Sequence, residues 1–226
     1  MFSGKRIKIK QRVVSLGGNC MGTMEMRKYF GVEAANMFDW WITPGDALVR
    51  LIENDFADLF LPRNLQLVGN SRSVANTRYG ILHHHDFPRN DAEDRIIGLS
   101  DADIERNREK FAYLKKRWDD LGDNGGPVLF IRYGWQMGEP MLAGIPPEPL
   151  GADATRLIAA LDRKFPRLDY QILFIDAPEI TLRHEKILQR ASRIFSQPHE
   201  RLNAADLTWK DNNAIFSRLF STVRLR

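Results

Sequence analysis

The sequence has a single cysteine, Cys20, among its 226 residues. One cysteine cannot form an intramolecular disulfide, and a thiol outside any disulfide is typical of proteins in a reducing compartment. No apolar run approaches the roughly 20 residues that a helix needs to cross a bilayer, and no continuous apolar stretch follows the basic amino terminus as in a secretory signal. We therefore expect a cytoplasmic protein without a membrane span.

The chain also lacks a strong excess of charge of either sign. Its 33 basic and 29 acidic residues are scattered and leave a formal net charge of +4. The one local basic run, residues 4–12, is short and fits a solvated leading segment or an edge strand better than a phosphate-binding arm. We expect no nucleic-acid partner, and the sequence predicts no particular oligomeric state.

Short apolar segments alternate along the chain with segments that have one apolar helical face. Continuous apolar runs bounded by turn residues are typical of strands covered on both faces. Such strands are predicted at residues 13–16, 127–133 and 169–177, with a fourth around Ile194. Helices are predicted at residues 21–30, 43–60, 101–121, 152–165 and 209–220, whereas 65–68 and 77–87 fit strands or extended loops. The alternation predicts an α/β fold with a largely parallel sheet flanked by helices, as one domain over residues 1–226.

The segment around Cys20 predicts a reactive position. The predicted strand ends at Gly17 and Gly18, Asn19 and Cys20 follow, and then a helical pattern begins. Reactive groups gather outside the carboxyl ends of parallel strands, and a helix amino end lowers the pKa of a thiol from about 8.5. The free backbone N–H groups and the Asn19 amide could also hold an oxyanion. The alternatives are a buried cysteine that acts as a small apolar side chain and a phosphate-binding loop with unusual spacing.

Three consecutive histidines, His83, His84 and His85, stand before Asp86. A thiol nucleophile needs an imidazole to take its proton, and the imidazole needs a group that fixes its tautomer. In an extended segment His83 and His85 would share one face, and Asp86 could orient a histidine only if the backbone turns there. A zinc site from His83, His85 and Asp86 is an alternative, but no second cluster of ligand residues stands out. We expect no metal and no cofactor.

Four further residues are candidate substrate contacts: Asp39, Trp40, Arg132 and Asp176. Asp39 could orient a histidine, bind substrate or accept backbone N–H bonds, and Asp176 is another candidate orienting carboxylate. Trp40 fits a core position better than a substrate platform. Arg132 ends an apolar strand, where an arginine needs an acidic partner or a substrate carboxylate or phosphate.

Several of these segments, taken in order, resemble a known bacterial family. The segments SLGGNC at residues 15–20, FDWW at 38–41, HDF at 85–87 and VLFIRY at 128–133 resemble a family labelled putative papain-like cysteine peptidase. The carboxyl-terminal segment LTWKDNNAIFSRLF is also similar to the end of that family. The resemblance implies a cysteine nucleophile at Cys20 and a catalytic imidazole at His85.

These observations predict a thiol hydrolase or acyltransferase that acts on a small-molecule or peptide substrate. Cys20 would attack a carbonyl, His85 would act as base and then acid, and Asp86 or Asp176 would orient it. Asn19 and backbone N–H groups would form the oxyanion hole.

Two other functions remain open from the sequence. The first is a carbohydrate- or nucleotide-handling protein in which Asn19, Asp39, His85 and Arg132 bind polar ligand groups and Cys20 is a passive wall. The second is an esterase that resembles the Gly-Asp-Ser hydrolases, although the late Asp-x-x-His of those enzymes is missing.

Overall fold

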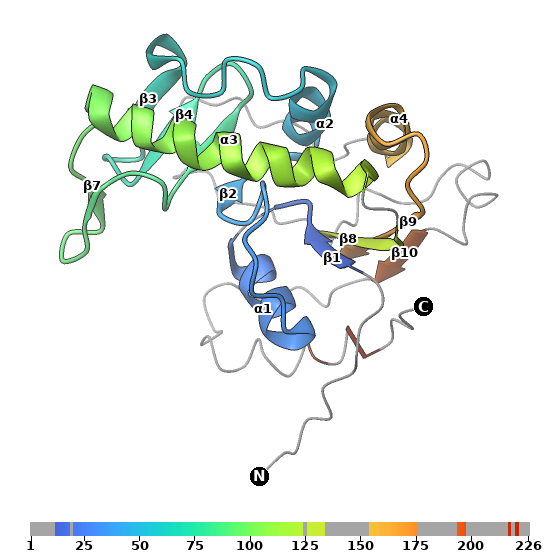
Figure 1. The fold of residues 1–226 in the computed structure, drawn as a ribbon. Coiled ribbons are helices and arrows are strands. Elements are labelled where there is room, and N and C mark those ends of the chain that lie inside the picture. Colours follow the sequence, from blue (N-terminus) through green and yellow to red (C-terminus); the bar gives the residue numbers. More distant parts are fainter. Residues whose placement is uncertain are drawn as a thin grey trace.

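The computed structural model describes residues 12–18, 20–123, 126–133, 154–175 and 194–197, together with 217, 220 and 221. These residues form a mixed helix and strand structure with one parallel and two antiparallel sheets (Figure 1). Within them, no helix combines the length and the apolar character that crossing a membrane requires.

The parallel sheet has four strands in the order β1, β8, β9, β10. They are β1 (Arg12–Ser15), β8 (Val128–Tyr133), β9 (Tyr170–Ile175) and β10 (Ile194–Gln197). Val14 pairs with Phe130, and Phe130 pairs with Ile172, and all three side chains are buried. The sequence predicts these four strands because a sheet covered on both faces needs apolar side chains at consecutive positions.

The middle of the chain forms antiparallel sheets, so the sheets of the described residues are mixed and the prediction of a largely parallel sheet is confirmed only in part. One sheet has the order β2 (Trp41–Ile42), β5 (Ile81–His83), β4 (Ser73–Asn76), β3 (Leu65–Val68), and β6 (Arg89–Asn90) pairs with β7 (Arg95–Ile96). Short turns connect β3 to β4, β4 to β5 and β6 to β7, and parallel neighbours would need long crossovers. Between β3 and β4, residues Gly69, Asn70 and Ser71 all have positive φ. The larger antiparallel sheet connects to β1 through a parallel bridge between Gly18 and Ile42.

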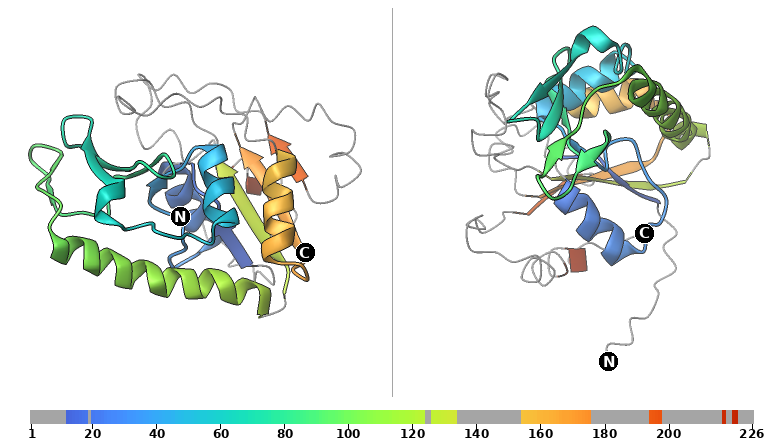
Figure 2. Two further views of the ribbon diagram at one scale, coloured as in Figure 1. Left: turned by 90° about the horizontal axis from the view of Figure 1, so that it is seen from above. Right: turned by 90° about the vertical axis from the view of Figure 1, so that its left-hand side faces the viewer.

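Helices cover both faces of the parallel sheet. Helix α1 (Cys20–Phe30) lies on one face, and α2 (Gly45–Glu53), α3 (Asp101–Asp123) and α4 (Ala154–Lys164) lie on the other (Figure 2). A short 3₁₀ helix, η1 (Pro62–Asn64), precedes β3. The predicted helix at 209–220 lies mostly outside the described residues.

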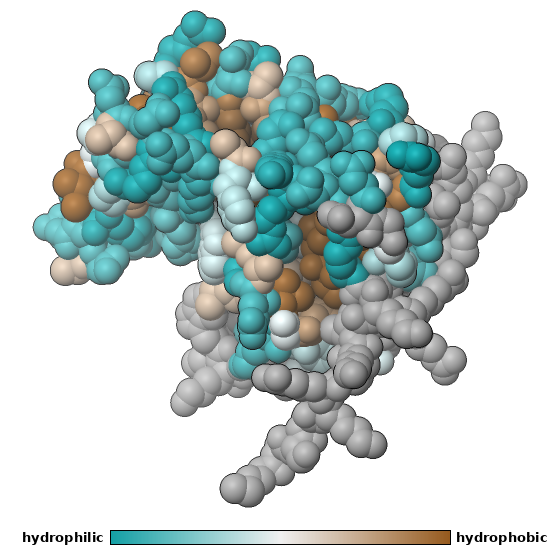
Figure 3. All heavy atoms as spheres, in the orientation of Figure 1, coloured by the Kyte–Doolittle hydropathy of each residue, from teal (hydrophilic) through white to brown (hydrophobic). Residues whose placement is uncertain are grey.

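The core is continuous from the parallel sheet to the antiparallel sheet. Helix α3 contributes the apolar face that its sequence predicts, and Trp118 on that face contacts both Phe130 of β8 and Phe38 before β2. Its outer face is polar, as the mainly hydrophilic surface over α3 shows (Figure 3). This shared core fixes the loops that carry Cys20, Trp40 and the histidines relative to the sheets.

Candidate functional site

Cys20 is the first residue of α1 and follows a tight turn after β1. The chain leaves β1 at Ser15, and Gly17 and Gly18 have φ values of 74° and 120°, which an L side chain rarely adopts. The Cys20 side chain is partly exposed. Its neighbour Asn19 lies outside the described residues. The thiol therefore lies at the positive end of a helix and beyond the carboxyl end of a parallel strand.

Close packing around Gly17 fixes the shape of this turn. A Cβ on Gly17 would lie 3.2 Å from Phe38 Cβ and 3.2 Å from Thr43 Oγ1. The Gly17 N–H donates to Ser15 Oγ at 3.0 Å, and Ser15 Oγ shares a hydrogen bond with Thr23 Oγ1 at 2.8 Å. The Ser15 hydroxyl thus ties the turn to the first part of α1.

Arg132 of β8 stabilises the same turn through hydrogen bonds to the backbone. Its guanidinium is buried and donates from Nη1 to the Leu16 carbonyl at 2.9 Å and from Nη2 to the Thr43 carbonyl. Burial lowers the pKa of Arg132 to about 10. Among the described residues no carboxylate forms an ion pair with it, and Asp176 lies outside them. Arg132 joins two backbone segments, and its predicted contact with substrate stays a prediction.

The backbone turns directly after β5, so the three histidines face different surroundings. His83 is the last residue of β5 and is fully buried. Its Nδ1 lies 2.9 Å from Asp86 Oδ2, and its ring contacts Trp41, Phe60 and Phe111. The turn therefore pairs Asp86 with His83.

Asp86 is the centre of a buried polar group. Its Oδ2 also accepts a hydrogen bond from Trp41 Nε1 at 3.0 Å, and Lys110 Nζ donates to Oδ1 at 2.7 Å. Burial alone would raise the pKa of Asp86, but the His83 hydrogen bond and the Lys110 charge bring it below its usual value. The Asn107 side-chain amide donates a hydrogen bond from Nδ2 to the Asp86 backbone carbonyl at 3.0 Å. This group anchors the turn that carries His84 and His85.

His84 lies between the antiparallel strands. Its Nδ1 is 3.0 Å from Ser73 Oγ of β4 and 3.4 Å from an Arg89 nitrogen of β6. Burial, followed by the positive charge of Arg89, lowers the pKa of His84 to about 4.

His85 is exposed and lies beside Trp40. The two ring centroids are 5.8 Å apart at an interplanar angle of 75°, and the His84 ring lies 4.7 Å away at 90°. Partial loss of hydration, followed by the charge of Arg89, lowers the pKa of His85. No hydrogen bond reaches the His85 imidazole from the part of the chain that the structure describes.

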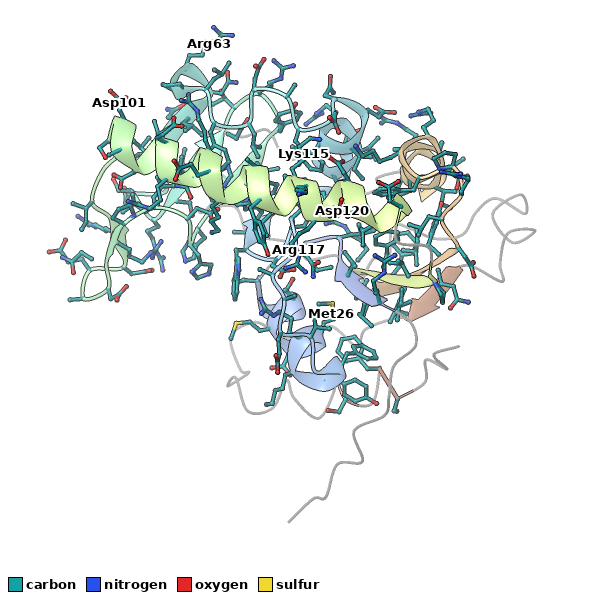
Figure 4. All side chains as sticks on the ribbon, in the orientation of Figure 1. Met26, Arg63, Asp101, Lys115, Arg117 and Asp120 are labelled. Atoms are coloured by element: carbon teal, nitrogen blue, oxygen red, sulfur yellow. The ribbon has the colours of Figure 1, made fainter. Side chains whose placement is uncertain are left out.

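Asp39 and Trp40 connect α1 to this region. Asp39 is fully buried, and its Oδ2 accepts from the Asn36 N–H at 2.9 Å and from Arg27 Nη1 at 3.3 Å. Burial raises the pKa of Asp39 to about 6, although Asn36, Arg27 and Arg117 oppose this. Arg117 projects from α3 into the space between α3 and α1 (Figure 4). Asp39 therefore connects the loop before β2 to α1 through these hydrogen bonds, and its carboxylate is buried away from solvent.

Trp40 is half-buried, whereas the adjacent Trp41 is fully buried in the core. The Arg27 guanidinium carbon lies 5.8 Å from the Trp40 ring centroid, and His85 lies on the same tryptophan. Arg27 belongs to the helix that begins with Cys20. Arg27 of α1 therefore contacts Trp40, and Trp40 in turn contacts His85.

Among the described residues we found no metal-binding cluster, and the cavity beside α3 contains neither Cys20 nor His85. No three His, Cys, Asp or Glu side chains of the described chain come together as metal ligands. A cavity of about 240 Å³ lies between residues 56–61 and α3, with Lys115 at its wall (Figure 4), but neither Cys20 nor His85 lines it.

Several residues that shape the site carry no signal in the sequence. Ser73, Arg89 and Arg27 act from other strands or helices, and nothing in their local patterns marks them. The His83–Asp86 pair had a weak signal, because Pro88 shortly afterwards favours a turn.

Fold and site together define an α/β protein with its one thiol at a strand-to-helix turn and an exposed imidazole on the turn that follows β5 of the connected antiparallel sheet. Residues 11–179 match the model of a family described as "Putative papain-like cysteine peptidase (DUF1796)". Because the match covers more than half of the sequence, the chain belongs to this family. Searches of curated proteins and of solved structures give no match.

Proposed function

We propose that the protein is a thiol-dependent hydrolase or acyltransferase in which Cys20 is the nucleophile and His85 the general base. The observation that carries the proposal is the place of Cys20 at the first residue of α1, one residue after two glycines with positive φ. Membership in a family with a cysteine peptidase description supports the same chemistry. The substrate is a small molecule or a peptide with a reactive carbonyl.

The amino end of α1 supplies the electrostatics that a thiolate needs. The first N–H groups of a helix have no partner within the helix, and the helix dipole favours negative charge there. Both effects lower the pKa of a thiol, and the same N–H groups can stabilise the oxyanion that forms on the substrate carbonyl. The Asn19 amide is an additional donor in this proposal.

His85 is suited to act as the base. Its lowered pKa keeps it neutral at pH 7, and neither ring nitrogen is engaged by the described residues. His85 takes the proton from the Cys20 thiol, the sulfur attacks the carbonyl, and the imidazolium then protonates the leaving group. Water or another acceptor releases the acyl group from sulfur, with His85 again as base.

Strand pairing through β2 connects the turn of Cys20 to the strand before His85. Gly18 bridges Ile42, and Ile42 pairs with Leu82, so only β2 separates the turn of Cys20 from the strand that leads to His85. The thiol and imidazole must come within about 3 Å in the substrate complex, and catalytic hydrogen bonds often tighten only there.

The reactivity of Cys20 tests the proposal. We expect iodoacetamide to alkylate Cys20 at pH 7 about tenfold faster than an ordinary exposed thiol, and His85→Ala to remove most of this difference. The matched control is Ala112→Cys in a Cys20→Ala background, because residue 112 is exposed in the middle of α3. Mass spectrometry gives both rates. Equal rates for the two thiols, together with full activity of Cys20→Ala, would refute the proposal.

A further inference from the structure

Among the described residues no carboxylate reaches the imidazole of the candidate base, and Asp176, the other predicted orienting carboxylate, lies outside them. Asp86 is directed into the core, where it holds His83, Trp41 and Lys110. Among the described residues nothing donates to or accepts from the His85 ring nitrogens. A base that accepts a proton in a defined direction nevertheless needs a fixed ring orientation.

Two aromatic rings contact the His85 imidazole. Trp40 and His84 both lie nearly perpendicular to it, at interplanar angles of 75° and 90°. Edge-to-face contacts at such centroid distances are a favourable arrangement for aromatic rings. Rotation of the His85 ring would disturb both contacts.

The His84 ring is itself fixed by hydrogen bonds. Arg89 can only donate, so the His84 Nδ1 that faces it is an acceptor. The Ser73 hydroxyl can donate to the same atom at 3.0 Å. The proton of neutral His84 therefore resides on Nε2. A further Arg89 bond to the His84 carbonyl, 3.1 Å long, holds the backbone.

Burial, together with the surrounding charges, keeps His84 neutral while His85 accepts a proton. Burial is the main cause of its lowered pKa, Arg89, His85 and Arg72 act in the same direction, and Asp94 opposes them. His84 therefore does not compete with His85 for the proton near pH 7.

Trp40 is fixed from the side of α1. Arg27 lies against its ring and donates from Nε to the Val32 carbonyl at 3.1 Å and from Nη1 to Asp39. These bonds tie the residues before β2 to α1.

We propose that Trp40 and His84 are positioning residues whose ring contacts fix the orientation of the His85 imidazole, the task that a carboxylate or amide has in most thiol–imidazole sites. The inference rests on the proposed function, in which His85 is the base. It assigns different tasks to adjacent histidines, with His85 as proton acceptor and His84 as a neutral support.

Ring-retaining and ring-removing variants separate this task from simple folding. In Trp40→Ala and His84→Ala we expect the alkylation rate of Cys20 at pH 7 to fall about tenfold, whereas Trp40→Phe and His84→Phe stay within about twofold of the native rate. In the two alanine variants the pKa of His85, followed by NMR titration, should rise toward about 6.5 because its ring gains hydration. Long-range ¹H–¹⁵N spectra of the native protein should show the His84 proton on Nε2.

The outcomes distinguish the two proposals. If His85→Ala slows alkylation but the alanine variants of Trp40 and His84 do not, the positioning task is refuted and the function stands. A proton on Nδ1 of native His84 would also refute the positioning task and leave the proposed function standing. If His85→Ala leaves the rate unchanged, the proposed function itself fails. Should circular dichroism show that the alanine variants do not fold, a tenfold loss in the phenylalanine variants would refute the positioning task, and retained rates would support it.

Discussion

Neighbouring residues of the same type have different surroundings in this protein. His83, His84 and His85 follow one another, yet the first is buried against Asp86, the second accepts from Ser73, and the third is exposed beside Trp40. The His83–Asp86 geometry is that of an oriented base, but burial in an aromatic core keeps His83 from any substrate. Accessibility therefore favours His85 as the base.

At the residue scale, the raised pKa of Asp39 predicts that the free energy of unfolding depends on pH. Its pKa is raised to about 6, so the folded state binds this proton more tightly than the unfolded state. Its stabilising contribution is complete below about pH 4 and is lost as the pH rises through about 6. Relative to Asp39→Asn, the native protein should lose up to about 3 kcal/mol of unfolding free energy between pH 4 and pH 7.

Urea unfolding at pH 4, 5, 6 and 7 measures this difference directly. The difference between the native protein and Asp39→Asn should shrink or change sign as the pH rises. A difference that stays constant over this range would show that Asp39 titrates normally.

At the element scale, the turn between β1 and α1 depends on Gly17. A side chain there meets both the positive φ of 74° and the contacts with Phe38 and Thr43. We expect Gly17→Ala to lower the free energy of unfolding by about 2–3 kcal/mol, measured by urea unfolding.

Gly31 offers a matched control for that substitution. It has a similar φ of 66°, but a Cβ added there would meet no atom within 4 Å. Gly31→Ala should therefore cost only about 1 kcal/mol, from the backbone alone. Equal losses in the two variants would contradict the close packing at Gly17.

The elements that the sequence predicts well are those with a strong local pattern. β8 is a continuous apolar run, and α3 repeats buried residues such as Phe111 and Trp118 at helical spacing. The antiparallel strands β4 and β5 had only short patterns, and their pairing depends on turns of a few residues. The direction in which the Asp86 side chain points likewise depends on one backbone bend after β5. The spacing of residues in the sequence does not predict this bend.

At the scale of the whole molecule, Arg132 joins parts that are far apart in sequence. From β8 it binds the Leu16 carbonyl after β1 and the Thr43 carbonyl before α2, and Gly18 and Thr43 are also connected by a backbone hydrogen bond of 3.2 Å. The parallel sheet and the antiparallel sheet therefore meet at the turn that precedes Cys20.

Replacing Arg132 tests this connection. A lysine keeps the charge but cannot donate to both carbonyls in the same geometry, so one buried carbonyl loses its partner. We expect Arg132→Lys to lower the unfolding free energy by about 2–3 kcal/mol, as determined from urea unfolding curves. Arg163→Lys is the control, since Arg163 is exposed and pairs only with Glu53 among the described residues; its effect should stay within about 0.5 kcal/mol. Similar small effects for both would show that the two bonds contribute little.

The pH profile of Cys20 alkylation by iodoacetamide is the most direct measurement of the central claim that a helix amino end and His85 activate the thiol. The account predicts an inflection below pH 7 in the native protein and a shift toward about 8.5 in His85→Ala. A native inflection at or above about 8.5 that His85→Ala leaves in place would contradict it.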